Sequence, residues 1–362
     1  MHKKDSEYHV SGKCFSKEDL LQLCDDELAD VQISTFKRAL YSFIKEWFSF
    51  TEYVIANTSG STGKPREIKL LKKHMIASAQ ATISYFNLSK KDKVLLCLPL
   101  HFIAGKMMVV RALVGGLDLY VSEPSSNPEI PETDIQFSAM VPLQVTNLLK
   151  EHPDVFTQIE KLIIGGSFIP DQLLQQLKQI NTQVWHTYGM TETITHVAVR
   201  KINGTGKGEM YSALPGVSLS LDNDCIVVNA PHLGICDLKT NDLAEMDQVG
   251  RFRITGRADN VMISGGLKLF PEKIEQKISG LLSEDYFIGG LNDPKLGKRM
   301  VLFIEKNSHI ERQIFNLWLK LEEKLEKYEV PKEIAFLKAF TKTKTGKTDR
   351  QATIAQYEMT SS

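Results

Sequence analysis

Apolar and polar positions change their spacing along the chain, and these changes predict its secondary structure. The first fifty residues predict helices, because Ser16 and Asp19 form a capping-box pattern and residues 36–47 place apolar side chains at helical spacing. From residue 53 onward, short apolar runs alternate with amphipathic stretches. The runs predict strands at 53–56, 67–71, 93–98, 117–121, 137–141, 161–164 and 183–187, with helices at 74–86, 103–114, 142–150 and 170–179.

This alternation predicts an α/β fold with mixed, mostly parallel sheets flanked by helices. After Lys201, glycines and prolines become frequent and the expected strands shorten, which indicates a small β subdomain. The strands expected there are 218–221, 225–229 and 252–255, and the helical stretches that follow them are 271–282 and 310–327. We expect an N-terminal domain of residues 1–256 and a mobile C-terminal α+β domain of residues 257–362.

Composition narrows the possible partners. The 44 Lys and Arg residues balance 44 Asp and Glu residues, so the chain has no net field that would attract nucleic acid or an anionic membrane. The most apolar stretch, residues 94–121, carries charged side chains and is interior structure, since a membrane span needs about 20 nearly uncharged residues. Five cysteines without C-x-x-C spacing predict free thiols. We expect a cytoplasmic protein without a signal peptide, either a monomer or a homodimer.

A segment rich in glycine and hydroxyl groups lies between the first two strands of the alternating region. Residues 57–66 read Asn-Thr-Ser-Gly-Ser-Thr-Gly-Lys-Pro-Arg. The glycines let successive backbone N–H groups point into one concavity, and Lys64 adds a positive charge, which suits a polyphosphate. It is not a Walker A loop, because Pro65 follows the lysine and the glycines are too close together. Taken alone, the segment is also typical of a turn.

Three further motifs suit a nucleotide ligand, although each has a plainer interpretation. In Tyr188–Thr193, the hydroxyl of Thr191 is next in sequence to the carboxylate of Glu192, and this pair suits a Mg²⁺–phosphate complex. The plainer interpretation is a turn from strand to helix in which Thr191 caps the helix. At the expected domain boundary, Arg257 in the motif Gly-Arg-Ala-Asp suits a contact with ribose hydroxyls or phosphate. The plainer interpretation of this segment is an interdomain turn. Residues 338–350 hold five basic residues, which by themselves are typical of a solvated tail.

The order and spacing of these motifs resemble those of the adenylate-forming superfamily, which includes acyl-CoA synthetases, aryl-CoA ligases, peptide-synthetase adenylation domains and luciferases. The resemblance covers about residues 53–350. It is carried by Thr58–Pro65, Tyr188–Thr193, Asn241-Asp242, Gly256–Asp259 and Thr345-Gly346-Lys347. Within the superfamily, residues 98–106, residues 211–217 and the compact length are most similar to the o-succinylbenzoate–CoA ligases of menaquinone synthesis.

Four features differ from the usual pattern. Arg66 stands where a lysine is usual, and Thr341 stands where proline is frequent. His101 precedes Phe102, whereas the usual ligase order is the reverse. The chain is also short for the superfamily, and we expect much of the usual N-terminal subdomain to be missing from it.

The resemblance implies an ATP-dependent acid–CoA ligase, which adenylates a small carboxylic acid with release of pyrophosphate and then forms a thioester with CoA. The implied acid is o-succinylbenzoate; the alternatives are another aryl or fatty acid, or a non-catalytic nucleotide-binding regulator. Lys347, Thr191 and Glu192 are the implied catalytic residues, with Glu192 holding Mg²⁺ and Asp259 acting as a hinge. The implied ATP and AMP contacts are Thr58, Ser59, Gly60, Ser61, Thr62, Gly63, Lys64, Gly166, Tyr188, Gly189, Thr191, Asp242 and Arg257, and the implied acyl and CoA contacts are His101, Lys106, Gly265 and Gly266.

Overall fold

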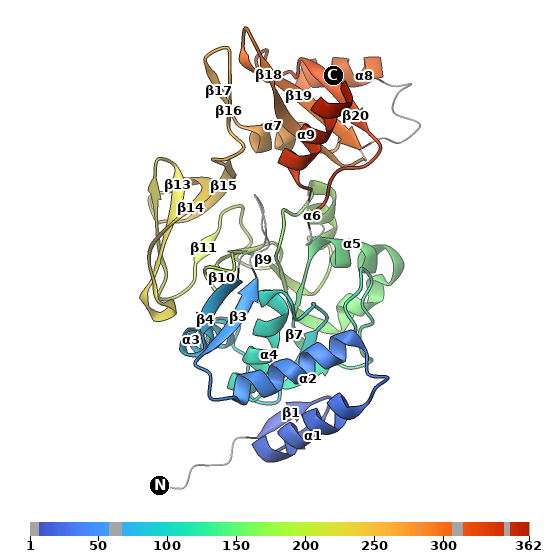
Figure 1. Ribbon diagram of the computed structural model, residues 1–362, viewed down its shortest axis with the longest axis vertical. Coiled ribbons are helices and arrows are strands. Elements are labelled where there is room, and N and C mark those ends of the chain that lie inside the picture. Colours follow the sequence, from blue (N-terminus) through green and yellow to red (C-terminus); the bar gives the residue numbers. More distant parts are fainter. Residues whose placement is uncertain (1–6, 58–66, 283, 306–313, 344–347, 362) are drawn as a thin grey trace. The chain divides into compact units, whose positions relative to one another are not determined.

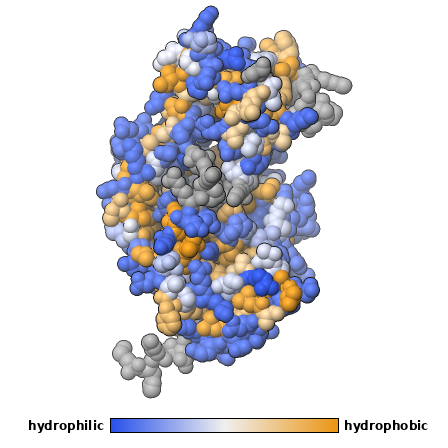
Figure 2. All heavy atoms as spheres, in the orientation of Figure 1, coloured by the Kyte–Doolittle hydropathy of each residue, from blue (hydrophilic) through white to orange (hydrophobic). Residues whose placement is uncertain are grey.

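The computed structural model describes residues 7–57, 67–282, 284–305, 314–343 and 348–361 (Figure 1). The described residues fall into two compact units. The first lies within Met1–Thr58, Pro65–Leu219 and Val228–Asp237, and the second lies within Ser220–Val227 and Leu238–Ser362. The expected division between residues 256 and 257 into two functional domains stays a prediction. In Figure 2, hydrophobic residues lie scattered among hydrophilic ones, as is normal for protein surfaces.

The first unit is built on a nine-stranded sheet in the order β11-β10-β9-β8-β7-β5-β6-β1-β2. Pairing is parallel from β9 to β1, and antiparallel strands lie at both edges, which confirms the mostly parallel sheet. The strands are β1 (Tyr8–Val10), β2 (Lys13–Phe15), β5 (Lys93–Leu96), β6 (Asp118–Val121), β7 (Ile135–Met140), β8 (Ile159–Ile164), β9 (Gln183–Gly189), β10 (His196–Lys201) and β11 (Ser212–Ala213).

The helices expected between these strands are confirmed. They are α3 (Lys72–Tyr85), α4 (Ile103–Gly115), α5 (Pro142–Glu151) and α6 (Asp171–Leu177). Ahead of them come α1 (Lys17–Ala29), which Ser16 caps as expected, α2 (Thr35–Phe48), and a hairpin of β3 (Tyr53–Asn57) with β4 (Glu67–Leu71). The expectation that the first fifty residues are helical is wrong for β1 and β2, because strands of three residues are too short to show an alternating pattern.

The small β subdomain is a four-stranded sheet in the order β12-β13-β14-β15. Its strands are β12 (Ser218–Asp222), β13 (Cys225–Ala230), β14 (Ile235–Met246) and β15 (Phe252–Arg257). The long strand β14 was missing from the expected elements, because many of its side chains are exposed and polar and its sequence lacks an apolar alternation.

The remainder of the second unit is α+β, as expected. A five-stranded sheet contains β16 (Met262–Ser264), β17 (Leu267–Leu269), β18 (Tyr286–Asp293), β19 (Gly297–Glu305) and β20 (Glu333–Leu337), and its helices are α7 (Pro271–Lys277), α8 (Ile314–Lys324) and α9 (Arg350–Ser361). Alternate residues of β19 face opposite cores: Leu302 packs with α7 and α8, and Phe303 packs beside α9. The helix α7 ends before the expected residue 282, and α9 was not among the expected elements.

No described helix combines the length and the apolarity that a bilayer crossing requires.

Candidate active site

Several residues that the sequence singled out lie at the carboxyl ends of strands in the first unit. His101 follows β5, the turn at residues 165–167 follows β8, and Tyr188 and Gly189 end β9. Because parallel pairing joins β5, β7, β8 and β9, these ends lie at one edge of the sheet, where α/β proteins bind ligands. The His101 ring packs on Phe102 with 3.9 Å between centroids, and partial burial lowers the pKa of this histidine.

Thr191 and Glu192 lie in a tight turn that joins β9 to β10, not at the start of a helix. The alternative in which Thr191 caps a helix is therefore wrong. The turn folds back so closely that a Cβ atom on Gly189 would lie 2.4 Å from the Thr195 carbonyl oxygen, so only glycine fits there. Thr191 is buried and Glu192 is exposed, and both residues lie at this edge of the sheet.

Hydrogen bonds of Thr193 hold this turn in a strained conformation. The Thr193 hydroxyl accepts from the Met190 N–H at 2.9 Å and donates to the Thr195 carbonyl at 2.8 Å. Ile194, which lies between Thr193 and Thr195 in the chain, has a φ of 66° although its side chain is buried. A β-branched residue rarely adopts this left-handed conformation, and such strain is concentrated at functional sites.

A buried histidine links β9 to the turn that follows β8. The Tyr211 hydroxyl lies 2.7 Å from His186 Nδ1, and His186 Nε2 lies 3.0 Å from the Ser167 carbonyl oxygen. Burial, reinforced by the nearby Arg200 charge, lowers the pKa of His186 to about 4. Burial also raises the pKa of Tyr211 to about 12, and the Tyr188 ring packs edge-on against the Tyr211 ring.

The sequence interpretation missed Arg111, whose side chain lies behind the β9–β10 turn. Arg111 comes from α4 and is 2% exposed, and its Nη2 donates to Thr195 Oγ1 at 3.0 Å. Its Nη1 lies 3.5 Å from Met108 Sδ. Among the described residues, its Nε has no hydrogen-bond partner and no carboxylate forms an ion pair with the guanidinium. Burial lowers the pKa of Arg111 to about 9. The signal that could have found it is an arginine inside the apolar stretch 94–121.

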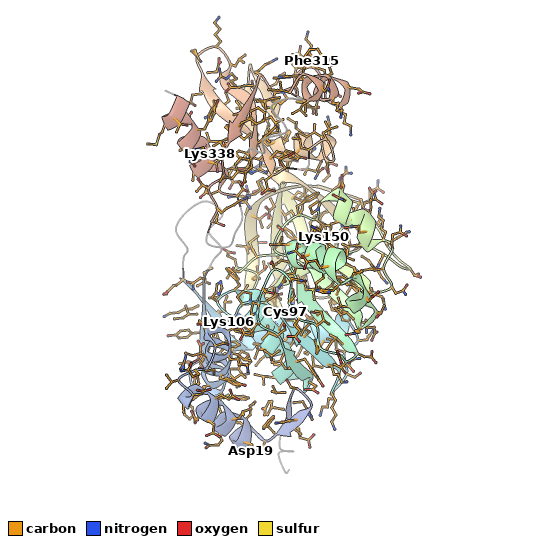
Figure 3. The ribbon with its side chains drawn as sticks, turned by 90° about the vertical axis from the view of Figure 1, so that its right-hand side faces the viewer. Asp19, Cys97, Lys106, Lys150, Phe315 and Lys338 are labelled. Carbon is orange, nitrogen blue, oxygen red and sulfur yellow. The ribbon has the colours of Figure 1, made fainter. Side chains whose placement is uncertain are left out.

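Lys106, which the resemblance placed among the acyl and CoA contacts, joins α4 to the N-terminal elements (Figure 3). Its Nζ donates to the Ile55 carbonyl at 3.0 Å, lies 4.0 Å from Glu46 Oε2, and sits 4.9 Å from the centre of the Phe43 ring. Burial lowers its pKa, against the opposing effect of Glu46. The ammonium group therefore anchors β3, and a substrate contact by Lys106 stays a prediction.

In the second unit, the expected ribose, phosphate and hinge residues form one cluster. Asp242 on β14 is the register partner of Arg257 on β15. Arg257 Nη1 donates to Asp242 Oδ1 at 3.0 Å, and its Nε and Nη2 donate to the two oxygens of Asp259, each at 3.0 Å. Burial alone would lower the pKa of Arg257, but the two aspartates together raise it. The three residues thus support one another before any ligand binds.

Gly265 and Gly266 form the two-residue turn of the β16–β17 hairpin. Their φ angles are 56° and 84°, and Ser264 pairs with Leu267 across the turn. Two successive positive φ angles are what the favoured two-residue hairpin turn requires, so the hairpin itself accounts for both glycines. Their contact with CoA stays a prediction.

The expected phosphate-loop residues Thr58, Ser59, Gly60, Ser61, Thr62, Gly63 and Lys64 lie outside the described residues, as do Arg66 and Lys347. Their roles rest on the resemblance alone and stay predictions.

Comparison with known proteins identifies the class to which this site belongs. Residues 49–240 match the AMP-binding enzyme family, and this match spans more than half of the 362 residues. The chain therefore belongs to the family of AMP-binding enzymes, as its motifs predicted.

Individual relatives agree with this class. The chain is 25% identical over 346 residues to a 2-succinylbenzoate–CoA ligase of Listeria monocytogenes, covering 88% of this chain and 73% of the relative. A crystal structure from Dyadobacter fermentans, described as an acyl-CoA synthetase (AMP-forming)/AMP-acid ligase II-like protein, is 33% identical, with a TM-score of 0.61; the match covers 92% of this chain and 97% of that one. An O-succinylbenzoate coenzyme A synthetase from Bacillus subtilis, in complex with ATP and a magnesium ion, shares the fold with a TM-score of 0.68 at 20% identity, over 83% of this chain and 69% of that one.

Proposed function

We propose that this protein is an ATP-dependent acid–CoA ligase whose acid is o-succinylbenzoate. The observation that carries the proposal is membership of the AMP-binding enzyme family together with the 25% identity, over most of the chain, to a 2-succinylbenzoate–CoA ligase. A cytoplasmic location fits, because its cysteines are free thiols, as expected in a reducing compartment.

In the first half-reaction, a carboxylate oxygen of the acid attacks the α-phosphorus of ATP and pyrophosphate leaves. Such a transfer needs positioning and charge neutralisation more than covalent help from the protein. Thr191 would bind the α-phosphate, and the exposed Glu192 beside it would hold Mg²⁺, an ion that takes one or two carboxylates and leaves its other positions to phosphate and water. When bound, the ion would neutralise phosphate charge.

Residues elsewhere in the chain would complete this step. Lys347 would bridge the attacking carboxylate and the α-phosphate. The β- and γ-phosphates would be held by Ser59, Ser61, Thr62 and Lys64. Asp242 would accept hydrogen bonds from the ribose hydroxyls.

In the second half-reaction, the CoA thiol gives up its proton to solvent, its sulfur forms a bond to the acyl carbon of the adenylate, and the acyl–oxygen bond breaks so that AMP leaves with the bonding electrons. We propose that residues 257–362 rotate about Asp259 between the two half-reactions and withdraw Lys347 from the site. A hinge of this kind needs a few residues that absorb a large change of φ and ψ. The turn Gly265-Gly266 then leaves room for the pantetheine arm.

Arg111 supports an acid with a second carboxylate over a fatty acid. Its guanidinium is a buried positive charge without an ion-pair partner among the described residues, and it contacts the Thr195 side chain of the β9–β10 turn. A charge held in a low-dielectric wall attracts an anion more strongly than one in water. An aromatic acid that carries an additional anionic group fits this field, whereas an aliphatic chain gains nothing from it.

The test is pyrophosphate release from ATP with a panel of acids, with and without CoA. We expect o-succinylbenzoate to be used better than benzoate or octanoate, and CoA thioester to form only with CoA present. Equal use of the three acids contradicts the substrate, and absence of turnover with every acid favours a nucleotide-binding regulator.

A further inference from the structure

We propose that Tyr211 and His186 are positioning residues, which fix the turn after β8 and so prepare it to bind the nucleotide. The inference rests on the proposed function, in which Gly166 of this turn is an ATP contact. Neither side chain needs to touch the nucleotide, because both act through the backbone of Ser167.

The partners of His186 define its protonation. A carbonyl oxygen only accepts hydrogen bonds, so the contact of 3.0 Å between His186 Nε2 and the Ser167 oxygen requires a proton on Nε2. The neutral ring then has a lone pair on Nδ1, which accepts from the Tyr211 hydroxyl at 2.7 Å. The chain of bonds therefore has one direction, from the tyrosine through the imidazole to the turn.

Burial and the neighbouring Arg200 charge keep the hydrogen-bonded pair of Tyr211 and His186, here called the relay, neutral. Tyr211 and His186 are each 5% exposed. Burial and the Arg200 charge lower the pKa of His186 to about 4, and burial raises the pKa of Tyr211 to about 12. The guanidinium of Arg200 lies 5.5 Å from the centre of the Tyr211 ring. Near neutral pH both groups are therefore uncharged, and the proton on Nε2 remains available to the turn.

The turn at residues 165–167 is held at both ends, by a backbone hydrogen bond at Gly165 and by the His186 side chain at Ser167. The Gly165 N–H donates to the Met140 carbonyl at 3.1 Å, which holds the start of the turn on β7. Gly166 follows with a φ of 86°, and the Ser167 carbonyl comes next. A left-handed glycine in an exposed turn has many accessible conformations, so a bond on each side of it restricts them. A positioning role suits Tyr211 and His186, because both side chains are buried and their hydrogen bonds lead to an exposed turn at the edge of the sheet where ligands bind.

The decisive experiment is calorimetric titration of ATP with Mg²⁺ into the full-length protein and its Tyr211→Phe variant. This variant keeps the buried ring and loses only the hydroxyl, so the imidazole loses one of its two hydrogen bonds and holds Ser167 less firmly. We expect the Kd for ATP to rise about fivefold, the effect of losing one ordinary hydrogen bond. Tyr328→Phe is the matched control, because Tyr328 is 62% exposed in the second unit, and its Kd should equal that of the unaltered protein.

Two substitutions at His186 separate positioning from packing. The His186→Gln amide places a donor near the position of Nε2 and should keep most of the ATP affinity, whereas His186→Leu offers no donor and should lose it. Nitrogen-15 NMR of labelled histidines gives an independent readout: His186 should carry its proton on Nε2 in the unaltered protein, and its Nδ1 signal should move in Tyr211→Phe, because Nδ1 has lost the hydrogen bond from Tyr211. A loss of melting temperature with an unchanged Kd would show a structural role and overturn the proposal.

These outcomes are distinct from failure of the proposed function. If the protein binds ATP but adenylates no acid, the ligase proposal fails, and a weaker Kd in Tyr211→Phe still supports the relay. If the protein is an active ligase and Tyr211→Phe and His186→Leu bind ATP as well as it does, the relay is overturned. If the unaltered protein binds no ATP, both are overturned.

Discussion

Arg257 holds Asp259 with two parallel hydrogen bonds, from Nε to Oδ1 and from Nη2 to Oδ2, each 3.0 Å long. Its remaining nitrogen, Nη1, donates to Asp242. The expected hinge residue is therefore tied to an expected ribose-binding residue through one guanidinium. A forked arginine–carboxylate pair constrains orientation as well as distance. Any rotation about Asp259 must therefore either break this pair or move Arg257 together with Asp259.

Substitution of Asp259 by alanine should affect catalysis more than stability. Both side chains of the Arg257–Asp259 pair are partly exposed, so its loss should lower the free energy of unfolding by about 1 kcal/mol or less. The two half-reactions, measured separately, should change by different factors, because the hinge sets how often each arrangement is reached. Asp247→Ala, which removes an exposed pair with Arg251, is the control and should change both half-reactions equally. Equal changes in Asp259→Ala would count against the hinge.

Lys347→Ala should separate the half-reactions most clearly. Loss of a preorganised charge in the transition state should slow adenylate formation on the order of 10²–10³-fold. Thioester formation from preformed adenylate should be much less affected, since the proposed rotation would by then have removed Lys347 from the site. Pyrophosphate release and thioester formation are the two measurements, and Lys338→Ala at an exposed position should change neither. Equal losses in both would contradict the rotating domain.

Gly189→Ala should disrupt the turn that carries Thr191 and Glu192. The added methyl group would meet the Thr195 carbonyl at 2.4 Å, and overpacking of this kind costs about 1–3 kcal/mol. We expect a lower melting temperature and a strongly reduced rate of pyrophosphate release. Gly208→Ala is the matched control, because no atom lies within 4 Å of its new methyl group. Unchanged activity in Gly189→Ala would show that the shape of this turn does not matter for adenylation.

Arg111→Met should change substrate preference without weakening the fold. Burial of an unpaired charge costs free energy, so an apolar side chain of similar length should leave stability about the same in spite of the lost hydrogen bond to Thr195. If the charge attracts a second carboxylate through space, KM for o-succinylbenzoate should rise about tenfold, which corresponds to a lost attraction of about 1.4 kcal/mol, while KM for benzoate stays the same. A parallel rise for both acids would mean that Arg111 only supports the turn.

His186 should make the first unit less stable in acid. Its pKa is about 4 in the folded protein against an ordinary 6.5, so between these values the unfolded chain binds more protons and stability increases with pH. As pH falls from about 6.5 to about 4, up to about 3 kcal/mol should be lost, an upper limit from the size of the shift. Urea denaturation across this range should show a flatter dependence in His186→Gln, which has no group that titrates there. An unchanged slope would assign the acid sensitivity elsewhere, for example to the buried His196.

The elements that could be predicted are those whose pattern is local. The strands β5 and β8 are buried in the parallel part of the sheet, so their sequences contain short apolar runs, and α4 and α5 were expected close to their observed bounds. The hairpin of β1 and β2 could not be predicted in this way, because its strands have only three residues each. The long strand β14 is polar on much of its length, so pairing with its neighbours, rather than its own pattern, makes it a strand.

The sequence by itself determined the class of enzyme and the order of its motifs, because the residue types that suit phosphate and Mg²⁺ occur in short local segments. Only the tertiary structure decided which side chains support those motifs. Arg111 reaches Thr195 across 84 positions, and Tyr211 reaches Ser167 through His186. Such partners depend on strand order and register, which bring distant residues within hydrogen-bond distance, and no local pattern of polar and apolar positions encodes that distance.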